Sequence, residues 1–208
     1  MIGWNDINLR KWNEIESIYK KQYEDEILQT ADVISVVFGI TDPMELSPGE
    51  FSKYVEQLSF LKNPIPEKKL CNSYNINGTL YNFKGNLYEI SMGALMDWRR
   101  YSTEENINYA QCLSVFLIPD GHKYDDGYDM DKTIADIESL PIGDVLKLFN
   151  FFRAALQLSM DILLNYFNKL LKKTKLTKEQ KEMIKSKIKE AQEISDLTFS
   201  RTLSVTVK

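Results

Sequence analysis

Apolar side chains in the first forty residues recur at the three- and four-residue spacing of amphipathic helices. Asn8 or Asp6 can cap the first helix, because a side-chain oxygen at this place accepts a hydrogen bond from an amide of the first turn. A second apolar run, over residues 25–38, ends at Gly39, a residue type that commonly closes a helix. The pattern therefore predicts two successive helices. The apolar residues of the first are Leu9, Trp12, Ile15, Ile18 and Tyr19.

A third helix is predicted to begin after Ser47. Serine as the cap, Pro48 at the first helical position and Glu50 at the third form a capping box, which satisfies two amides of the first turn. Pro64 and Pro66 end the helical pattern, because proline lacks an amide hydrogen and restricts the residue before it. The apolar side of this helix consists of Phe51, Tyr54, Val55, Leu58 and Leu61.

One region, at about residues 72–90, is patterned as β-strands. Asn77-Gly78 stands between short segments that contain apolar residues, which is typical of a two-residue hairpin turn. Lys84-Gly85 stands between further apolar residues, so we expect a small antiparallel sheet of two or three strands. Because an isolated hairpin is not stable in water, the sheet must pack on the helices or on a partner.

The next part of the chain predicts three shorter helices. Ser91 can cap the first, whose apolar side includes Trp98. The second is predicted from about Thr103 to Ile118, where Pro119 and the following Asp-Gly end it. A polar loop over residues 122–131 then precedes the third.

The longest helical pattern spans Pro141 to Lys173. A helix that is apolar over most of its circumference is buried on several sides, so we expect it at the centre of the core or beneath another subunit. A membrane span is not expected, because Asp144, Lys147, Arg153 and Asp161 interrupt the pattern and no run of about 18 apolar residues occurs. Its apolar residues are Val145, Leu146, Leu148, Phe149, Phe152, Leu156, Met160, Leu163, Leu164, Phe167 and Leu171.

The last segments predict a helix over residues 177–195, which forms a hairpin with the long helix, and a tail over residues 198–207 that alternates with the period of a strand. Such a strand could add to the edge of a neighbouring sheet. The fold class is therefore mostly α with a small antiparallel sheet (α+β), with a helical core around one long C-terminal helix. We expect residues 1–173 to form a single helix-rich domain with the β region inserted, and residues 174–208 to add the C-terminal helix and tail.

Composition predicts a folded intracellular protein. With 43% hydrophobic and 12% aromatic residues, the chain has enough apolar surface to offset the entropy of ordering it. The net charge of −4 and pI near 5.2 argue against nucleic acid or an anionic membrane as partners, and the lysine-rich run from Lys169 to Lys178 suits a solvated helix end. Cys71 and Cys112 lack the C-x-x-C spacing of metal or redox sites, so we expect buried thiols. The first residues lack the pattern of a signal peptide, which favours the reducing cytoplasm.

No residue pattern predicts an enzyme or a cofactor site. His122 is the only histidine and lies in a Pro-Asp-Gly-His-Lys turn, which disfavours zinc sites and histidine-activated nucleophiles. No glycine-rich phosphate-binding motif occurs. The loop from Tyr124 to Asp131 concentrates four carboxylates, but their order is not that of a calcium-binding EF-hand loop. We expect a solvated turn and a helix cap at Asp129 or Asp131, with divalent-metal binding as the alternative.

Aromatic and arginine side chains are candidates for contacts with other proteins, because both types are enriched at interfaces. Trp98 is expected to anchor its helix in the core, while the arginines after it are expected to pair with acids or with a partner. Since the long helix is expected to bury part of its apolar surface within its own domain, the candidates lie mainly near the ends of the chain. They are Trp4, Trp12, Arg99, Arg100, Phe199, Leu203, Val205 and Val207, beside the exposed part of the long helix. For Trp4 and Trp12 a place in the core is the favoured alternative.

Several short segments between Val33 and Phe152 form a recognisable series. They are Gly85-Asn86-Leu87-Tyr88-Glu89-Ile90 leading into Met96-Asp97, Leu113-Ser114-Val115-Phe116-Leu117-Ile118-Pro119, Lys123-Tyr124-Asp125, Leu140-Pro141 and Phe151-Phe152. In these segments the chain resembles small proteins found among the morphogenesis genes of tailed bacteriophages, particularly phages of gut Bacteroidota and their crAss-like relatives. The matching residues are packing residues rather than a catalytic motif, and Met1 to Asp32 and Thr174 to Lys208 lie outside the resemblance.

The resemblance implies a non-enzymatic structural or assembly protein, in the tail or near the portal, with other phage structural proteins or further copies of itself as partners. An oligomer or a larger assembly is then expected, in the host cytoplasm during assembly and in the virion. One alternative is a transient tail-assembly chaperone that binds a helical client and is absent from the mature virion. Another is a metal-dependent enzyme that uses the loop from Asp125 to Asp131.

Overall fold

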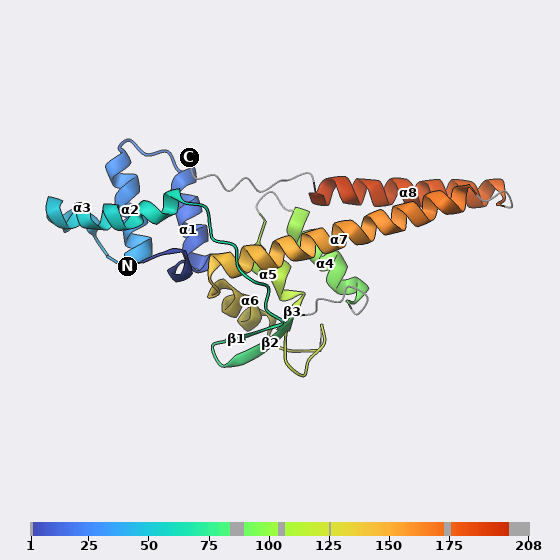
Figure 1. Ribbon diagram of the computed structural model, residues 1–208, viewed down its shortest axis with the longest axis horizontal. Coiled ribbons are helices and arrows are strands. Elements are labelled where there is room, and N and C mark those ends of the chain that lie inside the picture. Colours follow the sequence, from blue (N-terminus) through green and yellow to red (C-terminus); the bar gives the residue numbers. More distant parts are fainter. Residues whose placement is uncertain (1, 84–89, 104–106, 125, 173–175, 200–208) are drawn as a thin grey trace.

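Helices make up 65% of the protein and a three-stranded antiparallel sheet accompanies them, which confirms the mostly α fold class with a small sheet. The computed structural model describes residues 2–83, 90–103, 107–124, 126–172 and 176–199. The molecule is elongated (Figure 1), with α2 and α3 at one end and the adjoining ends of α7 and α8 at the other.

The N-terminal helices begin and end where the sequence indicates. Asn8 caps α1, because its side-chain oxygen accepts a hydrogen bond from the amide of Lys11. Gly39 closes α2 in the left-handed region with a φ of 71°, and Ser47 and Glu50 form the capping box of α3. The helices are α1 (Leu9–Lys20), α2 (Glu26–Phe38) and α3 (Pro48–Gln57), with 3₁₀ helices η1 (Trp4–Asp6), η2 (Pro43–Glu45) and η3 (Leu58–Lys62) beside them.

The sheet consists of β1 (Ser73–Ile76), β2 (Thr79–Phe83) and β3 (Leu117–Pro119), in that order. Asn77 and Gly78 form the predicted turn between β1 and β2, with φ angles of 49° and 81°, and this positive region suits Asn and Gly. The third strand comes from a part of the chain that was predicted as helix. The second turn that we predicted, at Lys84-Gly85, lies outside the described residues.

The helix expected from about Thr103 to Ile118 is wrong. In its place, α5 (Tyr109–Ser114) is short, and the chain then extends into β3. The physical reason is that every residue from Cys112 to Ile118 is buried, so the apolar run has no polar face whose period would distinguish helix from strand. The neighbouring helices are α4 (Met92–Thr103) and α6 (Met130–Glu138).

The two C-terminal helices are α7 (Ile142–Leu171) and α8 (Lys178–Phe199), which lie side by side as the predicted hairpin (Figure 1). The strand expected from Thr198 is wrong at its start, because Thr198 and Phe199 belong to α8. The rest of the predicted strand lies outside the described residues.

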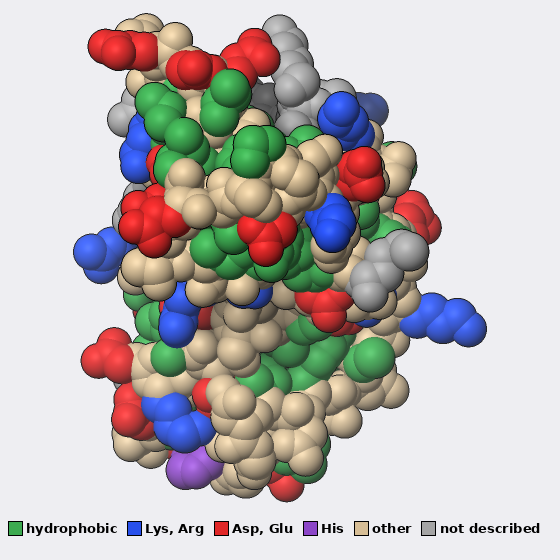
Figure 2. Space-filling view, turned by 90° about the vertical axis from the view of Figure 1, so that its left-hand side faces the viewer, with side chains coloured by type: hydrophobic (Ala, Val, Ile, Leu, Met, Phe, Trp, Pro, Cys, Tyr) green, Lys and Arg blue, Asp and Glu red, His purple; other side chains and the backbone are tan. Residues whose placement is uncertain are grey.

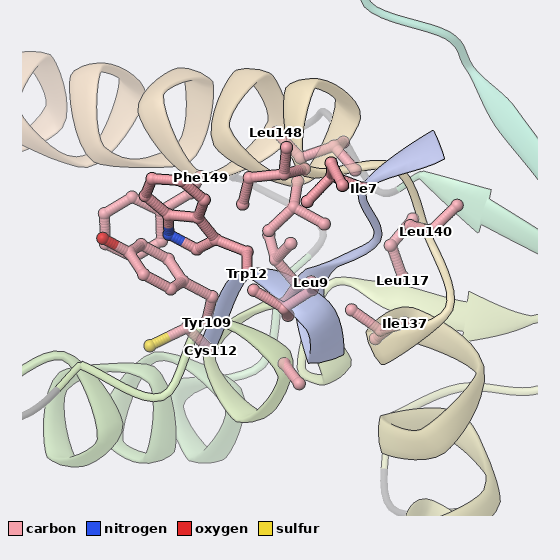
Figure 3. Packing of buried hydrophobic residues seen from close by; sticks show 14 of the residues in the cluster. Ile7, Leu9, Trp12, Tyr109, Cys112, Leu117, Ile137, Leu140, Leu148 and Phe149 are labelled. Atoms are coloured by element: carbon pink, nitrogen blue, oxygen red, sulfur yellow. The ribbon is translucent and has the colours of Figure 1, made fainter. Parts of the chain in front are cut away.

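The core lies where the N-terminal segment meets the start of α7. Ile142 donates its amide hydrogen to the carbonyl of Ile7 at 2.8 Å, and Leu9 donates to the carbonyl of Leu140 at 3.0 Å. These bonds hold α1 against α5, α6 and α7, whose buried side chains meet there (Figure 3). Towards the sheet, the rings of Phe116 and Phe152 are stacked with centroids 3.8 Å apart.

Candidate functional site

Helix α7 has two halves with opposite surroundings. Its first half is part of the core, because Val145, Leu148, Phe149 and Phe152 are all buried. Beyond Phe152, no described side chain of α7 is fully buried. A place at the centre of the core is therefore correct only for the first half. The second half leaves the body of the protein together with α8 (Figure 1), and its cover by another subunit stays a prediction.

The second half of α7 and the facing part of α8 form a helical hairpin, which we call the arm (residues 153–189). Its seam is apolar: Ile184 of α8 is buried and Ile188 is partly buried. On α7, Leu164 and Phe167 are partly buried, at the three-residue spacing of one helix face. The arm is therefore held by a narrow seam of the kind that joins two antiparallel helices.

A second apolar row on the arm has no cover among the described residues. Leu158, Ile162 and Tyr166 follow one another at four-residue intervals, which places them on neighbouring turns of one helix face. Their side chains are 62%, 56% and 57% exposed. At the rise of an α-helix, this exposed stripe is about 12 Å long. Large apolar side chains gathered in this way mark a surface that another molecule covers.

The far end of the arm is strongly basic. Residues 169–189 contain nine lysines and two glutamates, which gives this segment a net charge of +7 in a chain whose total charge is −4. Lys169 and Lys172 are exposed within and just after the last turn of α7, where cations interact favourably with the helix dipole. The exposed stripe thus leads directly into a positively charged end.

The predicted contact residues near the N-terminus serve the protein's own core. Trp4 is 8% exposed, and its ring packs at 5.7 Å from Trp12 and at 5.3 Å from Phe60. Trp12 lies among Tyr109 and Phe149 (Figure 3). Because both are buried, neither tryptophan offers a partner a substantial surface. The sequence could not decide this, because the periodicity that marks an apolar helix face does not say what covers that face.

The other predicted contact residues are placed differently. Arg99 and Arg100 are exposed on α4, while Trp98 before them is buried between Phe116 and Phe149, as the aromatic anchor was expected to be. Phe199 is the last residue of α8. The remaining three lie outside the described residues: Leu203, Val205 and Val207. Part of the long helix was expected to be exposed beside these contacts, but the stripe residues were not singled out.

The acidic loop before α6 organises its own turn. Asp129 caps α6 by accepting a hydrogen bond from the amide of Lys132 at 2.9 Å, and Asp126 accepts one from the amide of Lys123 at 2.8 Å. Asp125 lies outside the described residues. Within the described part of the chain, no group of three histidine, cysteine or acidic side chains is placed to hold a metal ion. His122 is exposed, and its ring lies 5.8 Å from that of Tyr128.

A buried carboxylate joins the sheet to α6. Asp136 is 5% exposed and accepts hydrogen bonds from the Tyr81 hydroxyl at 2.6 Å, the Lys132 ammonium at 2.6 Å and the Asn77 amide at 2.8 Å. Burial by itself raises the pKa of Asp136, but the three donors outweigh it and lower the pKa. Because all three partners stabilise the ionised form, the group is suited to fastening the hairpin turn rather than to transferring protons.

The surface also contains a shallow depression of about 540 Å³ between α1 and α2, lined mostly by polar and charged residues. Its rim includes the ion pair of Arg10 and Glu138, whose N···O distance is 3.1 Å. Charged groups of both signs line it, including Glu14, Lys21 and Asp32. This mixture, together with the open shape, gives no selectivity for one class of small ligand.

None of the described helices combines the length and apolarity that crossing a membrane requires. Comparison with known proteins yields no match to a family model, to a curated protein or to a solved structure. The arm, with its exposed stripe and basic end, is therefore the candidate site on geometric grounds alone.

Proposed function

We propose that this chain is a non-enzymatic structural or assembly protein of a tailed bacteriophage and that it acts by binding another protein through the arm. The observation that carries the proposal is the exposed stripe of Leu158, Ile162 and Tyr166 on a hairpin that projects from the body. Side chains on successive turns of one face are the surface against which another helix packs.

Covering the stripe supplies part of the free energy that a complex needs. Fully burying a side chain of this size contributes about 1.5–3 kcal/mol, and each of the three is more than half exposed. Covering them therefore contributes about 3–5 kcal/mol before the entropic cost of association. That is enough to select a partner but not to bind it tightly, so polar and charged groups around the stripe must add to the affinity.

The resemblance to phage morphogenesis proteins supports the setting of the proposal. The resemblance ends at Phe152, which is also where the buried half of α7 ends. Its described segments lie in the body, as Leu113 to Pro119 do in α5 and β3. The body would then be what the relatives share, while the arm supplies attachment to a particular assembly.

Mass spectrometry of purified phage particles tests this proposal. We expect peptides of the chain in particles of the phage that encodes it. Particles of a phage whose chain carries Leu158→Ser, Ile162→Ser and Tyr166→Ser should contain at least tenfold less of the chain. Met96→Ser is the control for loss of an exposed apolar side chain elsewhere, because Met96 is 68% exposed and lies on α4. Normal incorporation of the triple variant, with its fold checked by circular dichroism, would contradict the proposal.

A transient assembly chaperone is the second candidate. An apolar stripe that remains uncovered in the free protein favours it, because a chaperone must present such a surface to its client. In that case the chain would be absent from mature particles. It would instead co-purify from infected cells with one helical phage protein, and the triple variant at Leu158, Ile162 and Tyr166 would lose that client.

A further inference from the structure

Opposite charges are concentrated in two separate segments of the chain. Residues 24–56 contain eight carboxylates and one lysine, a net charge of −7, against the +7 of residues 169–189. The acidic residues are Glu24, Asp25, Glu26, Asp32, Asp42, Glu45, Glu50 and Glu56. The lysines are Lys169, Lys172, Lys173, Lys175, Lys178, Lys181, Lys185, Lys187 and Lys189.

The fold places the described parts of these segments at the two ends of the long molecular axis. Helices α2 and α3 carry the acidic residues at one end, and the adjoining ends of α7 and α8 carry the described lysines at the other (Figure 1). All eight carboxylates are exposed. Capping accounts for three of them, Asp25, Asp42 and Glu50, and the other five add to the charge of this end.

Each end also presents apolar side chains next to its charges. At the start of α2, Ile27 and Leu28 are 52% and 43% exposed and directly follow Glu26. Figure 2 looks onto this end and shows carboxylates around a group of hydrophobic side chains. At the other end, Tyr166 precedes Lys169 by one helical turn. Both ends therefore combine an apolar patch with charge, and the charges have opposite signs.

We infer that the protein bound by the arm is a second copy of this chain, whose acidic α2–α3 end receives the basic end of the arm. The inference rests on the proposed use of the arm as a binding surface. Unlike charges steer the two ends together and fix their orientation, while Leu158, Ile162 and Tyr166 cover Ile27 and Leu28. Because the two contacting surfaces differ, a complex of two copies retains one open arm and one open acidic end, so association continues into a ring or a filament.

Two charge variants of the full chain test the inference. The arm variant carries Lys169→Glu, Lys172→Glu and Lys178→Glu, which lowers the charge of the basic segment from +7 to +1. The second variant, called the lobe variant because it alters the acidic α2–α3 end (the lobe), carries Glu24→Lys, Glu26→Lys and Glu56→Lys, which brings the charge of the acidic segment from −7 to −1. All six residues are exposed, so both variants should keep the fold, as circular dichroism would verify.

Sedimentation velocity in 50 mM and 500 mM salt gives the readout. The original chain should form species larger than a dimer, with at least tenfold weaker association in high salt because the contact is between exposed charges. Each variant alone should be monomeric. An equimolar mixture should form a one-to-one dimer and stop there, because only the unaltered arm of the lobe variant and the unaltered lobe of the arm variant are complementary.

Three outcomes would overturn the inference: an original chain that stays monomeric at every concentration in low salt, a lobe variant that associates like the original, or a mixture that remains monomeric. The second would indicate a symmetric contact between arms. The triple serine variant at Leu158, Ile162 and Tyr166, the stripe variant, separates this inference from the proposed function. If the original chain is monomeric but the stripe variant still fails to enter particles, the arm binds a different protein. The proposed function then holds and only the second-copy inference fails. Normal incorporation of the stripe variant would remove the proposed function itself.

Discussion

The hydroxyl of Tyr81 donates a hydrogen bond to the Oδ2 of Asp136 at 2.6 Å, which joins β2 to α6 across 55 positions of the chain. The same carboxylate binds Lys132 and Asn77. A single buried side chain thus connects a strand, a hairpin turn and a helix, and its removal leaves several donors without an acceptor.

We expect Asp136→Ala to lower the free energy of unfolding by about 1–3 kcal/mol, because the buried Tyr81 hydroxyl loses its acceptor. Tyr81→Phe should cost less, about 1 kcal/mol, since Asp136 keeps Lys132 and Asn77 as donors. Urea unfolding measures both. Asp131→Ala on the exposed side of the same helix is the control, and an equal effect at Asp131 would show that the network adds nothing.

The lowered pKa of Asp136 predicts a pH dependence of defined sign. A carboxyl whose pKa is lower in the folded state than its unfolded value of about 3.9 stabilises the fold fully above that value. The stabilisation is lost as the pH falls through the folded-state pKa. The difference in unfolding free energy between the original chain and Asp136→Asn should therefore be constant above about pH 5 and shrink below about pH 4. A difference that grew on acidification would contradict the assignment.

The two halves of α7 should respond differently to truncation. Phe152→Ala should cost about 3–5 kcal/mol, because Phe152 is fully buried and stacks on Phe116. Leu158→Ala, six residues further along the same helix, should change stability by less than about 0.5 kcal/mol. Thermal unfolding distinguishes the two variants. The protein concentration must be low, because self-association would cover Leu158 and its truncation would then lower the stability. Comparable losses would mean that the second half is covered within its own chain.

Two glycines should give effects of opposite sign when replaced by alanine. Gly78 has a φ of 81°, which costs an L-amino acid about 1–2 kcal/mol, so Gly78→Ala should destabilise the hairpin. Gly49 lies in α3 with nothing within 4 Å of an added Cβ, so Gly49→Ala should stabilise the protein by about 0.4–1 kcal/mol. Denaturant midpoints compare them directly. A stabilising Gly78→Ala would be incompatible with the turn described.

The two cysteines should react with a thiol reagent in two steps. Cys71 is exposed and Cys112 is fully buried, so the expectation of two buried thiols is wrong for Cys71. One thiol should be modified in the native protein and a second only in denaturant. Cys71→Ser should abolish the native reaction, whereas Cys112→Ser should leave it. Rapid modification of both thiols without denaturant would contradict the burial of Cys112.

Local signals in the sequence were enough to predict the helix ends and the hairpin. Asn8, Gly39, Ser47 and Asn77 each act through neighbours within about four positions, so their residue types alone determine what they do. The third strand, near Leu117, could not be predicted, because its pairing with Phe83 depends on contact between distant segments.

The candidate site was predictable only in part, for the same reason. An apolar helix pattern shows which side chains avoid water but not where the body of the protein stops covering them. Phe152 and Leu158 therefore look alike in the sequence, while one is buried and the other is 62% exposed. The fastening of Asp136 was also missed, since its partner Tyr81 lies on a different element.

The pairing of Ile7 with Ile142 has a consequence for synthesis of the chain. The amide that completes this hydrogen bond is made 135 residues after its acceptor. At translation rates of about 5–20 residues per second, the N-terminal helices wait roughly 7–27 s for the segment that covers their apolar faces. During that interval Leu9 and Trp12 lack the α7 side chains that pack beside them in the folded protein. The body therefore closes only after translation has passed α6, and the arm emerges after the body.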